Sequence, residues 1–585
     1  MTPYDYAVLA FYFAYLLVIS WVFRRFVHNV SDYFRSGGQV IWWMAGGSAF
    51  IVSFSAWTFT GAASRAYGDG WPIIAIYLAN AAAFVTSAFY FAPRFRQLRV
   101  ITSMQAVRAR FGPGNEQFFM WLTLPLRTMY AGIWLYGLAV FFSAAFGMGL
   151  TNTILLAGGT VTAIALLGGS WAVVASDFIQ VLVLMPVTLV ATVLAMARLG
   201  GVGGFVHQLS ASRLDFGRLF GGGGFLLFWC LAMLAKQFFS ANSLTEAPRY
   251  FCVKDSRHAR KAALLAAVLM LLGVVIWFVP PMAASVTNPD LGREFPGLSH
   301  PGEASFFAIA TATFPVGMLG LLVSGVFAAT MSAMDAGLNS NAGIFIKNFY
   351  QPALRPEASE RELLLAGKVA TVCFGAVIVA LAQFDNRLGH FSLFQLMLDF
   401  GVLVALPQTL PLVLGIFLRR TPAWSGWSTV LVGFATGLLT RHFLTVDWAV
   451  RTFPGQGALD SWGRGNWEQA IAVVMNIGVG TAWFCLSGLF YHRESPAYRA
   501  AIEAFSRQIE SPVGEEEAGG ALDDRQSRLI GWLCLPYGGL ICLLSLIPNR
   551  PSGRLAFVFC GAVLLAIGGA LIVNSRSRAA TPSHA

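Results

Sequence analysis

Charged residues are scarce in this sequence, and their scarcity excludes an ordinary soluble protein. Asp, Glu, Lys and Arg together make up 11% of the 585 residues, whereas a soluble domain carries about a quarter. Hydrophobic residues make up 56%, and a soluble core cannot bury that much apolar surface. The composition therefore predicts an all-α protein that crosses a membrane many times.

Cysteine and histidine are also few, and neither shows the spacing of a disulfide framework or a metal site. The seven cysteines mostly lie in apolar runs, and the eight histidines lie in loops or at segment ends. The sequence has no Ser–His or His–Glu–His arrangement and no phosphate-binding loop, which an intramembrane enzyme or an ATP-driven pump would need. We therefore expect a protein that is not an enzyme and that binds no organic cofactor.

The net charge of +11 is interpreted as a topology signal rather than nucleic-acid binding, because the arginines lie beside apolar segments. Basic residues gather in alternate loops, for example at Arg94, Arg96 and Arg99 and again at Arg249. By the positive-inside rule, the N-terminus is expected outside and the C-terminus inside. The first apolar segment has no basic residue before it and no small-residue cleavage site after it, so we expect a retained span.

Apolar segments long enough to cross a bilayer predict fifteen spans. Their odd number agrees with termini on opposite sides of the membrane. The expected spans are 4–25, 40–66, 71–93, 117–147, 151–168, 171–197, 223–241, 262–286, 313–347, 362–384, 391–418, 424–442, 466–490, 528–547 and 555–574.

These spans predict a leading helix, two blocks of five spans and a C-terminal extension. The polar stretch in that extension is interpreted as a cytosolic linker with one amphipathic helix, and a regulatory contact is the alternative. The expected units are 1–39 for the leading helix and a cytosolic loop, 40–197 and 223–418 for the two blocks, 424–490 for accessory spans, 491–527 for the linker, 528–574 for a terminal hairpin and 575–585 for a cytosolic tail.

The first span of each block carries residues that interrupt a helix. The first block has the small and hydroxyl residues of Gly46–Gly61, and the second has Lys236–Ser243. Interrupted spans at matching positions indicate a binding site near the middle of an inverted-repeat transporter, because unwound backbone frees carbonyl oxygens for a cation. Close helix packing by small residues is the alternative for the first segment.

Three motifs, taken together, resemble the sodium:solute symporter family. They are Ser53–Gly61, Gly168–Gln180 and Ala328–Asp335, in the family's order and spacing within residues 4–490. The resemblance implies a LeuT-type fold with two inverted five-helix repeats, one extra N-terminal helix and about four extra C-terminal helices. It also implies a multi-pass protein in the lipid bilayer of a plasma membrane, such as a bacterial inner membrane. Such a protein moves a small organic solute together with a cation, here Na+, by alternating access.

The resemblance places one Na+ site at the backbone carbonyls of Ile51, Phe54 and Ala329 and at the hydroxyl of Ser332. A second hydroxyl that the family uses falls on Ala333, so this chain departs from the pattern. A hard cation takes about six oxygen ligands, and the loss weakens the site unless another group replaces the hydroxyl. The departure leaves a proton-coupled or uncoupled carrier or sensor of the same fold as the alternative function.

Two acidic residues offer that replacement. Asp335 follows Ser332 by three residues and so lies beside it on a helix. The resemblance makes Asp177 an acidic position on the ion path, which some members use in a second Na+ site with hydroxyls at positions matching Ser332, Asp335 and Ala336. We expect a cation site shifted toward Asp177 and Asp335, with Na+ favoured over a proton. The structural alternatives are that Asp177 caps the start of its helix and that Asp335 bonds to Asn339 or to another helix partner.

Two cations lie inside apolar spans, Lys236 and Arg127, and each predicts a counter-ion or an anionic ligand, because an unpaired charge there is costly. Three interpretations of Lys236 stay open. It binds an anionic or zwitterionic solute, it pairs with an acid such as Asp399 or Glu246, or it replaces a missing cation. Arg127 is expected to make a structural ion pair.

The resemblance also implies solute-facing residues on both interrupted spans. These are Trp57 and Thr58 on the first span and Lys236, Gln237 and Phe239 on the second. Phe239 and the phenylalanine before it occupy the zone where the family has an inner aromatic gate. Together these positions predict a solute site between the two interrupted spans.

Overall fold

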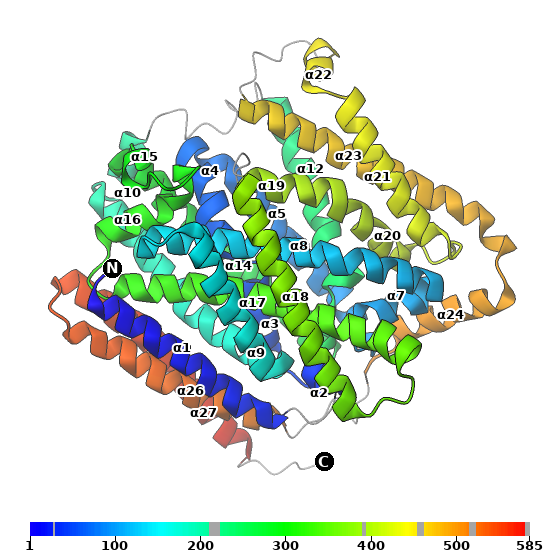
Figure 1. Cartoon of the computed structure of the whole chain (residues 1–585), viewed down its shortest axis with the longest axis horizontal. Helices are drawn as coiled ribbons and strands as arrows, with labels where there is room; N and C mark the ends of the chain where they lie inside the picture. The colour runs from blue at the N-terminus through cyan, green and yellow to red at the C-terminus, as the bar shows by residue number, and fades with distance from the viewer. Residues whose placement is uncertain (27–29, 210–222, 389–392, 453–460, 514–521, 580–585) are drawn as a thin grey trace.

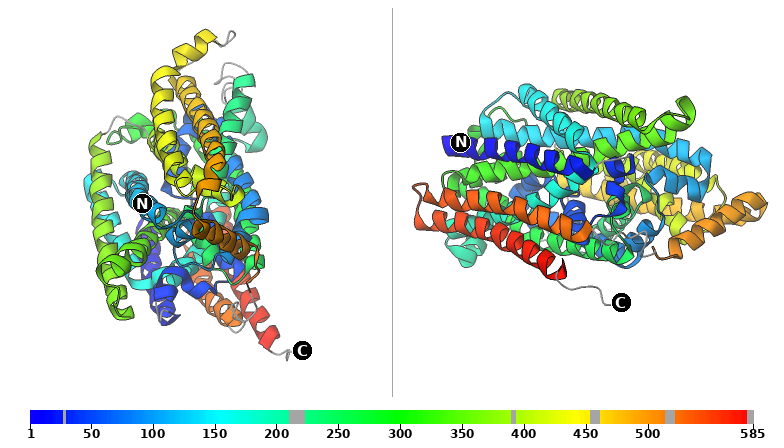
Figure 2. Two further views of the ribbon diagram at one scale, coloured as in Figure 1. Left: turned by 90° about the vertical axis from the view of Figure 1, so that its right-hand side faces the viewer. Right: turned by 90° about the horizontal axis from the view of Figure 1, so that it is seen from below.

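The computed structural model of the chain is built almost entirely of helices, coloured from blue to red along the chain (Figures 1 and 2). It describes all residues except 27–29, 210–222, 389–392, 453–460, 514–521 and 580–585. Parts of the predicted linker 491–527 and tail 575–585 therefore lie outside the described residues.

The helices follow one another with short connections. In chain order they are α1 Pro3–Phe23, α2 Val30–Arg35, α3 Trp42–Val52, α4 Ala63–Asp69, α5 Ile74–Thr86, α6 Ala92–Gln97, α7 Ser103–Phe111, α8 Pro113–Phe146, α9 Leu150–Arg198, α10 Gly201–Gln208, α12 Gly223–Ala241, α13 Pro248–Phe251, α14 Ser256–Thr287, α15 Leu291–Glu294, α16 Ser305–Thr313, α17 Met318–Phe345, α18 Glu360–Leu388, α19 Leu393–Phe400, α20 Leu406–Phe417, α21 Ser425–Phe443, α22 Val446–Thr452, α23 Ser461–Ser487, α24 Pro496–Glu510, α26 Leu522–Leu543 and α27 Pro551–Ala579.

Eleven helical stretches of the described chain are long and apolar enough to cross a membrane, and each overlaps a predicted span. The other four predicted spans differ in kind. The span 40–66 is interrupted, 151–168 and 223–241 correspond to shorter apolar helices, and 424–442 corresponds to α21, which is not among the eleven. The total of fifteen spans and the orientation therefore stay predictions.

The long helix α9 contains two of the predicted spans, 151–168 and 171–197. Thr151 contacts the last turns of α18, Ser170 bonds to Ser36 near the far end of α1, and Arg198 bonds to the end of α16. The chain therefore crosses the bundle twice within α9. A straight helix of its 49 residues would be about 74 Å long, more than twice the thickness of the hydrocarbon core.

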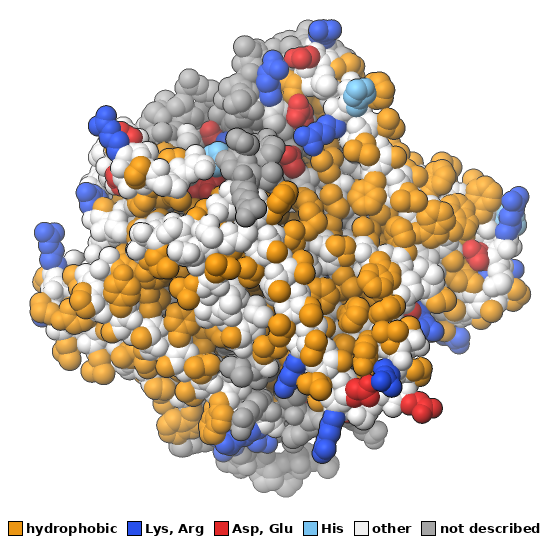
Figure 3. Space-filling model, viewed as in Figure 1, with side chains coloured by type: hydrophobic (Ala, Val, Ile, Leu, Met, Phe, Trp, Pro, Cys, Tyr) orange, Lys and Arg blue, Asp and Glu red, His pale blue; other side chains and the backbone are white. Residues whose placement is uncertain are grey.

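The outer surface is apolar in the way that a lipid-facing surface requires. Figure 3 shows hydrophobic side chains over the middle of the visible face, with charged groups mainly at its margins. On α18 the exposed large side chains are Leu365, Val369, Val372, Val377 and Phe384. A soluble monomer rarely exposes apolar patches of this extent. The chain is a multi-pass membrane protein.

The first interrupted helix is unwound within the segment where the sequence predicts it. α3 ends at Val52, residues 53–55 are unwound, and a π-helical turn, Thr58–Ala62, leads into α4. The hydroxyl of Thr330 on α17 accepts a hydrogen bond from the N–H of Ala56 at 2.8 Å. A side chain from another helix thus satisfies a backbone group that the interruption would otherwise leave without a partner.

The second interrupted helix breaks at the end of the segment where the sequence predicts it. α12 stays wound through Ala241, and the backbone leaves the α-helical path over 242–247 before α13 begins at Pro248. The reason is local: the six residues from Lys236 to Ala241 include no glycine or proline, whereas Ser243 accepts a hydrogen bond from the N–H of Thr245. The interruption therefore begins within the predicted segment Lys236–Ser243, at its last two residues, and continues beyond it.

Two C-terminal elements pack against the rest of the bundle. The hairpin α26–α27 lies beside α1, where Tyr15 donates a hydrogen bond to the carbonyl of Leu533 at 2.6 Å (Figure 1). The amphipathic helix α24, in the predicted linker, buries Phe505 against α6 and α7. Arg110 of α7 is fully buried and donates to the hydroxyl of Tyr498 on α24 at 3.2 Å. The described part of the linker is therefore docked on the bundle.

The helix after the second interruption, α14, begins with a side-chain cap. Asp255 accepts a hydrogen bond from the N–H of His258 at 2.7 Å. Burial acts to raise the pKa of Asp255, but hydrogen bonds from the side chain and the N–H of His258 outweigh it and lower this pKa to about 2. The cap therefore stays ionised at neutral pH.

Candidate functional site

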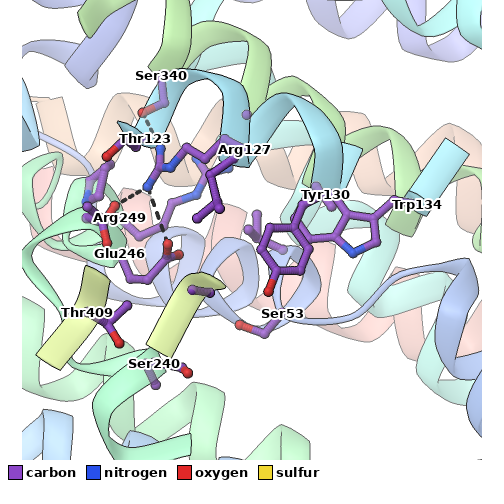
Figure 4. A pocket seen from close by; sticks show the side chains of 18 of the residues that line it. Ser53, Thr123, Arg127, Tyr130, Trp134, Ser240, Glu246, Arg249, Ser340 and Thr409 are labelled. Atoms are coloured by element: carbon purple, nitrogen blue, oxygen red, sulfur yellow. Dashed lines mark hydrogen bonds and ion pairs between the residues drawn. The ribbon is translucent and has the colours of Figure 1, made fainter. Parts of the chain in front are cut away.

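A cavity of about 380 Å³ lies between the two interruptions (Figure 4). Its volume is in the range of sites for small organic molecules. Side chains reach it from both interrupted helices, from α5, α8 and α17, and from a π-helical turn at Gly401–Ala405. Lining residues continue to Ser103 and Ser170, so the cavity extends toward the predicted cytoplasmic end of the bundle.

Four of the five predicted solute residues line this cavity: Trp57, Thr58, Lys236 and Gln237. Phe239 does not, because its ring is buried against Phe238, with ring centroids 5.3 Å apart. The physical reason is that α12 is wound here. Positions 236, 237, 240 and 241 share one face of a helix, and position 239 lies on another.

Lys236 enters the cavity as a buried ammonium group without a paired acid. Its residue is 7% exposed, and no carboxylate of the described residues lies within 4.0 Å of it; Asp399 acts on it only at longer range. A Cβ atom at position 401 would lie 3.0 Å from Nζ of Lys236. Because Gly401 has no side chain, there is room for the ammonium group. Pairing with Glu246, one of the expected alternatives, does not occur because that acid faces Arg127.

Arg127 is bound on three sides, as the structural interpretation expected. From α8 it donates to the hydroxyl of Ser340 on α17 at 2.5 Å and to the carbonyl of Thr245 in the second interruption. Its guanidinium also lies 3.4 Å from the carboxylate of Glu246. Figure 4 shows Arg127 in contact with Ser340 on one side and Glu246 on the other. Arg127 therefore ties the second interruption to α8 and α17.

The described lining of the cavity is positively charged. It includes the three cationic side chains of Arg127, Lys236 and Arg249, and a single carboxylate, that of Glu246. The carboxylate of Glu246 lies 3.4 Å from the guanidinium of Arg127. It therefore does not neutralise the other two cations of the lining, Lys236 and Arg249. Tyr130 and Trp134 of α8 form an aromatic wall nearby (Figure 4). Such a site suits a ligand with an anionic group.

The two acidic residues predicted for the cation lie deep in the bundle beside one another. Asp177 on α9 is 0% exposed and Asp335 on α17 is 2% exposed, and the two carboxylates act on each other electrostatically. Asp177 Oδ2 accepts a hydrogen bond from Ser48 on α3 and lies 3.7 Å from Nη2 of Arg249 on α13. Because Asp177 lies inside α9 rather than at its start, the helix-capping alternative is wrong.

Three oxygen atoms in this acidic group lack a hydrogen-bond partner among the described residues. They are Asp177 Oδ1, Asp335 Oδ1 and Ser332 Oγ, all of them buried. The amide atoms of Asn339 are also unpartnered, so the expected Asp335–Asn339 bond does not form. Buried oxygens without partners are rare and costly. Hard oxygen donors without partners are what a hard cation binds, so the residues present fit such an ion.

The residues predicted for the first Na+ site come from the end of α3, the unwound residues after it, and α17. Ile51 and Phe54 are at the first interruption, where the N–H of Phe54 donates to the carbonyl of Ile51 at 3.0 Å. Ala329 is buried on α17 next to Thr330, whose hydroxyl contacts the same interruption. Ser332 neighbours Asp177. Ser48, three residues before Ile51 on α3, donates to Asp177, so α3 joins the interruption to the acidic group. The side chain of Ala336, also implied by the resemblance, is outside the described residues.

Thr330, Ser48 and Arg249 contribute to the site, although their local sequence assigns them no site role. Thr330 lies in the motif Ala328–Asp335 and Ser48 in the segment Gly46–Gly61. Arg249 is one of the basic residues that indicate topology. A cation placed directly after an interrupted span was the available signal for Arg249.

A family model described as Sodium:solute symporter family matches residues 33–433. The chain belongs to the sodium:solute symporter family. Membership confirms the predicted class, a multi-pass transporter that is not an enzyme and whose coupling ion is Na+.

Curated relatives of this symporter differ in the solute for which they are named. It is 25% identical over 491 residues to the sodium/myo-inositol cotransporter 2 of Mus musculus, covering 75% of this chain and 70% of the relative. It is 26% identical over 453 residues to the sodium/sialic acid symporter NanT of Aliivibrio fischeri, covering 75% and 87%. It is 26% identical over 487 residues to a sodium/mannose cotransporter of Bos taurus, covering 75% and 78%.

A solved structure shares the fold. The substrate-bound, outward-open state of a Na+-coupled sialic acid symporter superposes with a TM-score of 0.66 at 20% identity, covering 82% of this chain and 98% of that chain. The likeness confirms the predicted LeuT-type architecture.

Proposed function

We propose that this symporter carries a small organic anion together with Na+ by alternating access. The solute occupies the cavity between the two interruptions, and its anionic group contacts Lys236. The single observation that carries the proposal is the buried ammonium group of Lys236, which lines the cavity without an acid within 4.0 Å among the described residues. A neutral polyol would leave that charge uncompensated.

The remaining lining suits a solute that also carries hydroxyl or amide groups. Thr58, Asn80, Gln237 and Gln408 offer hydrogen-bonding atoms, and Trp57 offers an aromatic surface. One relative is named for an acid, sialic acid, and two are named for neutral polyols. The uncompensated lysine favours the acid class for this chain.

The coupling ion is proposed to bind at the acidic group rather than at the interruption alone. Asp177, Ser332 and Asp335 supply oxygen atoms, including three without hydrogen-bond partners among the described residues. The carbonyls at the first interruption lack a hydroxyl from α17, which has Ala333 where the family has a hydroxyl. Two carboxylates also hold a monovalent cation more strongly than neutral oxygens do. Carbonyls of Ile51, Phe54 and Ala329 are the second candidate ligand set.

Alternating access is supported by the position of the cavity. Its described lining reaches Ser103 and Ser170 at one end of the bundle and includes no residue of α15 or α16 at the other. A cavity whose described lining extends toward one end of the bundle fits one half of a transport cycle.

Uptake into proteoliposomes tests this proposal. A panel containing sialic acid, small hydroxycarboxylates, amino acids, mannose and myo-inositol is offered with an inward Na+ gradient, and choline replaces Na+ in the paired experiment. We expect accumulation of a carboxylate above its external concentration only with Na+. Accumulation of mannose or myo-inositol with no carboxylate transported would contradict the anionic solute, and undiminished uptake in choline at every pH would contradict Na+ coupling.

A further inference from the structure

Arg249 lies beside the acidic group without being bonded into it. It is on the four-residue helix α13, directly after the second interruption, and its Nη2 is 3.7 Å from Asp177 Oδ2. That distance is longer than a hydrogen bond, and Nη2 has no hydrogen-bond partner among the described residues. The side chain is nevertheless largely buried, 13% exposed. The pair is therefore held by charge alone.

The charges at this point do not balance. Asp335 is acted on by both Asp177 and Arg249, so two carboxylates and one guanidinium share one buried region. Each carboxylate has lost its water, and a buried charge without a partner is strongly unfavourable. One guanidinium compensates one carboxylate. The second is neutralised either by a proton or by another cation, and for a cation the ligands available are the oxygens of both carboxylates and of Ser332 that have no partner among the described residues.

We propose that Arg249 is an internal competitor of the coupling cation. With the acidic group empty, the guanidinium partly neutralises Asp177 and Asp335. A Na+ that binds between these carboxylates repels the guanidinium and displaces it from Asp177. The inference rests on the proposed binding of Na+ at the acidic group and adds to it that the ion and Arg249 exclude each other.

Displacement of Arg249 has a structural consequence because of where the partners lie. Ser48, which donates to Asp177, is on the first interrupted helix, whereas Arg249 is on the second. The ion pair therefore fastens α13 to α9, on which Asp177 lies. Loss of the pair releases α13, which is only four residues long and is preceded by non-α-helical backbone. The cation thereby acts on the second interrupted helix without touching it.

Na+-dependent thermal stability of the purified full-length protein measures this competition. Na+ is titrated against choline at constant ionic strength in detergent, with wild type and the variants Arg249→Gln, Arg249→Lys, Asp335→Asn and the double variant Arg249→Gln/Asp335→Asn. We expect Arg249→Gln to lower the half-saturating Na+ concentration about tenfold, because the tethered cation no longer competes. Asp335→Asn should raise it about tenfold, and the double variant should return near wild type.

Controls separate competition from general loss of structure. Arg249→Lys keeps the charge and should stay near wild type. Arg108→Gln removes an arginine that lies 3.4 Å from Glu116, away from the acidic group, and should leave the half-saturating Na+ concentration unchanged. A purely structural role of Arg249 would lower the melting temperature by the same amount at all Na+ concentrations.

The outcomes distinguish this inference from the proposed function. If wild type is stabilised by Na+ and Arg249→Gln has the same or a higher half-saturating concentration, the competition is refuted and Na+ binding stands. If Na+ does not stabilise wild type over choline, both are refuted. Should Arg249→Gln fail to fold, the comparison of Asp335→Asn with the double variant decides, because the two differ only in Arg249; an equal or higher half-saturating Na+ concentration in the double variant refutes the inference.

Discussion

Replacing Lys236 by methionine tests the solute site most directly. Methionine has a similar length and no charge, so the change removes the ammonium group and keeps most of the packing. A hydrogen bond to a charged group contributes about 1.5–3 kcal/mol. We therefore expect Lys236→Met to weaken binding of the transported carboxylate roughly 10- to 150-fold.

The same variant should be more stable than wild type without solute. The residue is 7% exposed, and no acid of the described residues lies within 4.0 Å of its ammonium group. An uncompensated buried charge costs free energy, so its removal raises the melting temperature. If Lys236 were instead paired with Asp399, Lys236→Met would leave that acid alone and lower the melting temperature.

The assay uses two ligands and two variants. Binding of a transported carboxylate and of its uncharged amide is measured by thermal shift or calorimetry in saturating Na+. The amide should bind wild type weakly and bind Lys236→Met about as well as the carboxylate does. Lys261→Met removes an exposed lysine of α14 and serves as the control. Unchanged carboxylate affinity in Lys236→Met would refute the proposed role of this lysine.

Three further predictions concern side-chain hydrogen bonds that hold the first interruption, α24 and the start of α14 in place. Thr330→Val removes the hydroxyl that accepts a hydrogen bond from the buried N–H of Ala56 at 2.8 Å, which should cost about 1–3 kcal/mol of folding free energy. We expect a lower melting temperature for Thr330→Val and not for Thr330→Ser. Equal melting temperatures of the two variants would contradict a stabilising role of this hydrogen bond. Tyr498→Phe removes the hydroxyl that binds Arg110 and should speed proteolysis of the 491–527 region, whereas an unchanged cleavage rate would mean that this bond does not hold α24. Asp255 has a folded pKa of about 2 against an ordinary 3.8, so its contribution to the stability of the folded protein is present above pH 4 and is lost as the pH falls toward 2. In Asp255→Asn the melting temperature should therefore fall less between pH 4 and pH 2 than in wild type. The same dependence of melting temperature on pH in both proteins would refute the role of Asp255 as an ionised cap.

Much of the fold was predictable because it depends on local patterns. Apolar length indicated the spans, and the glycine, serine and threonine residues around Ser53 indicated the first interruption. The segment Lys236–Ser243 contains the start of the second interruption, but Lys236 and Gln237 stay helical because a helix accommodates these polar residues well. Only the cap at Ser243 and the proline at Pro248 mark where the backbone leaves the helix.

Site residues were predictable where they belong to a sequence motif. They were not predictable where only the packing of helices brings them to the site. Trp57, Thr58, Lys236 and Gln237 line the cavity, but Phe239 is on another face of the same wound helix. Arg249 is a single basic residue after a span, and many such residues only set topology. Nothing in its local sequence shows that it lies 3.7 Å from a carboxylate 72 positions earlier in the chain.

By itself the sequence determined the membrane environment, the family and the approximate path of the helices, since each follows from composition, hydrophobic length and short motifs. The tertiary structure decided which charges meet. It brings Asp177, Asp335 and Arg249 together from α9, α17 and α13, and it places no acid of the described residues within 4.0 Å of Lys236. The physical reason is that the free energy of a buried charge depends on neighbours a few ångströms away, and those neighbours are set by the packing of helices distant in sequence.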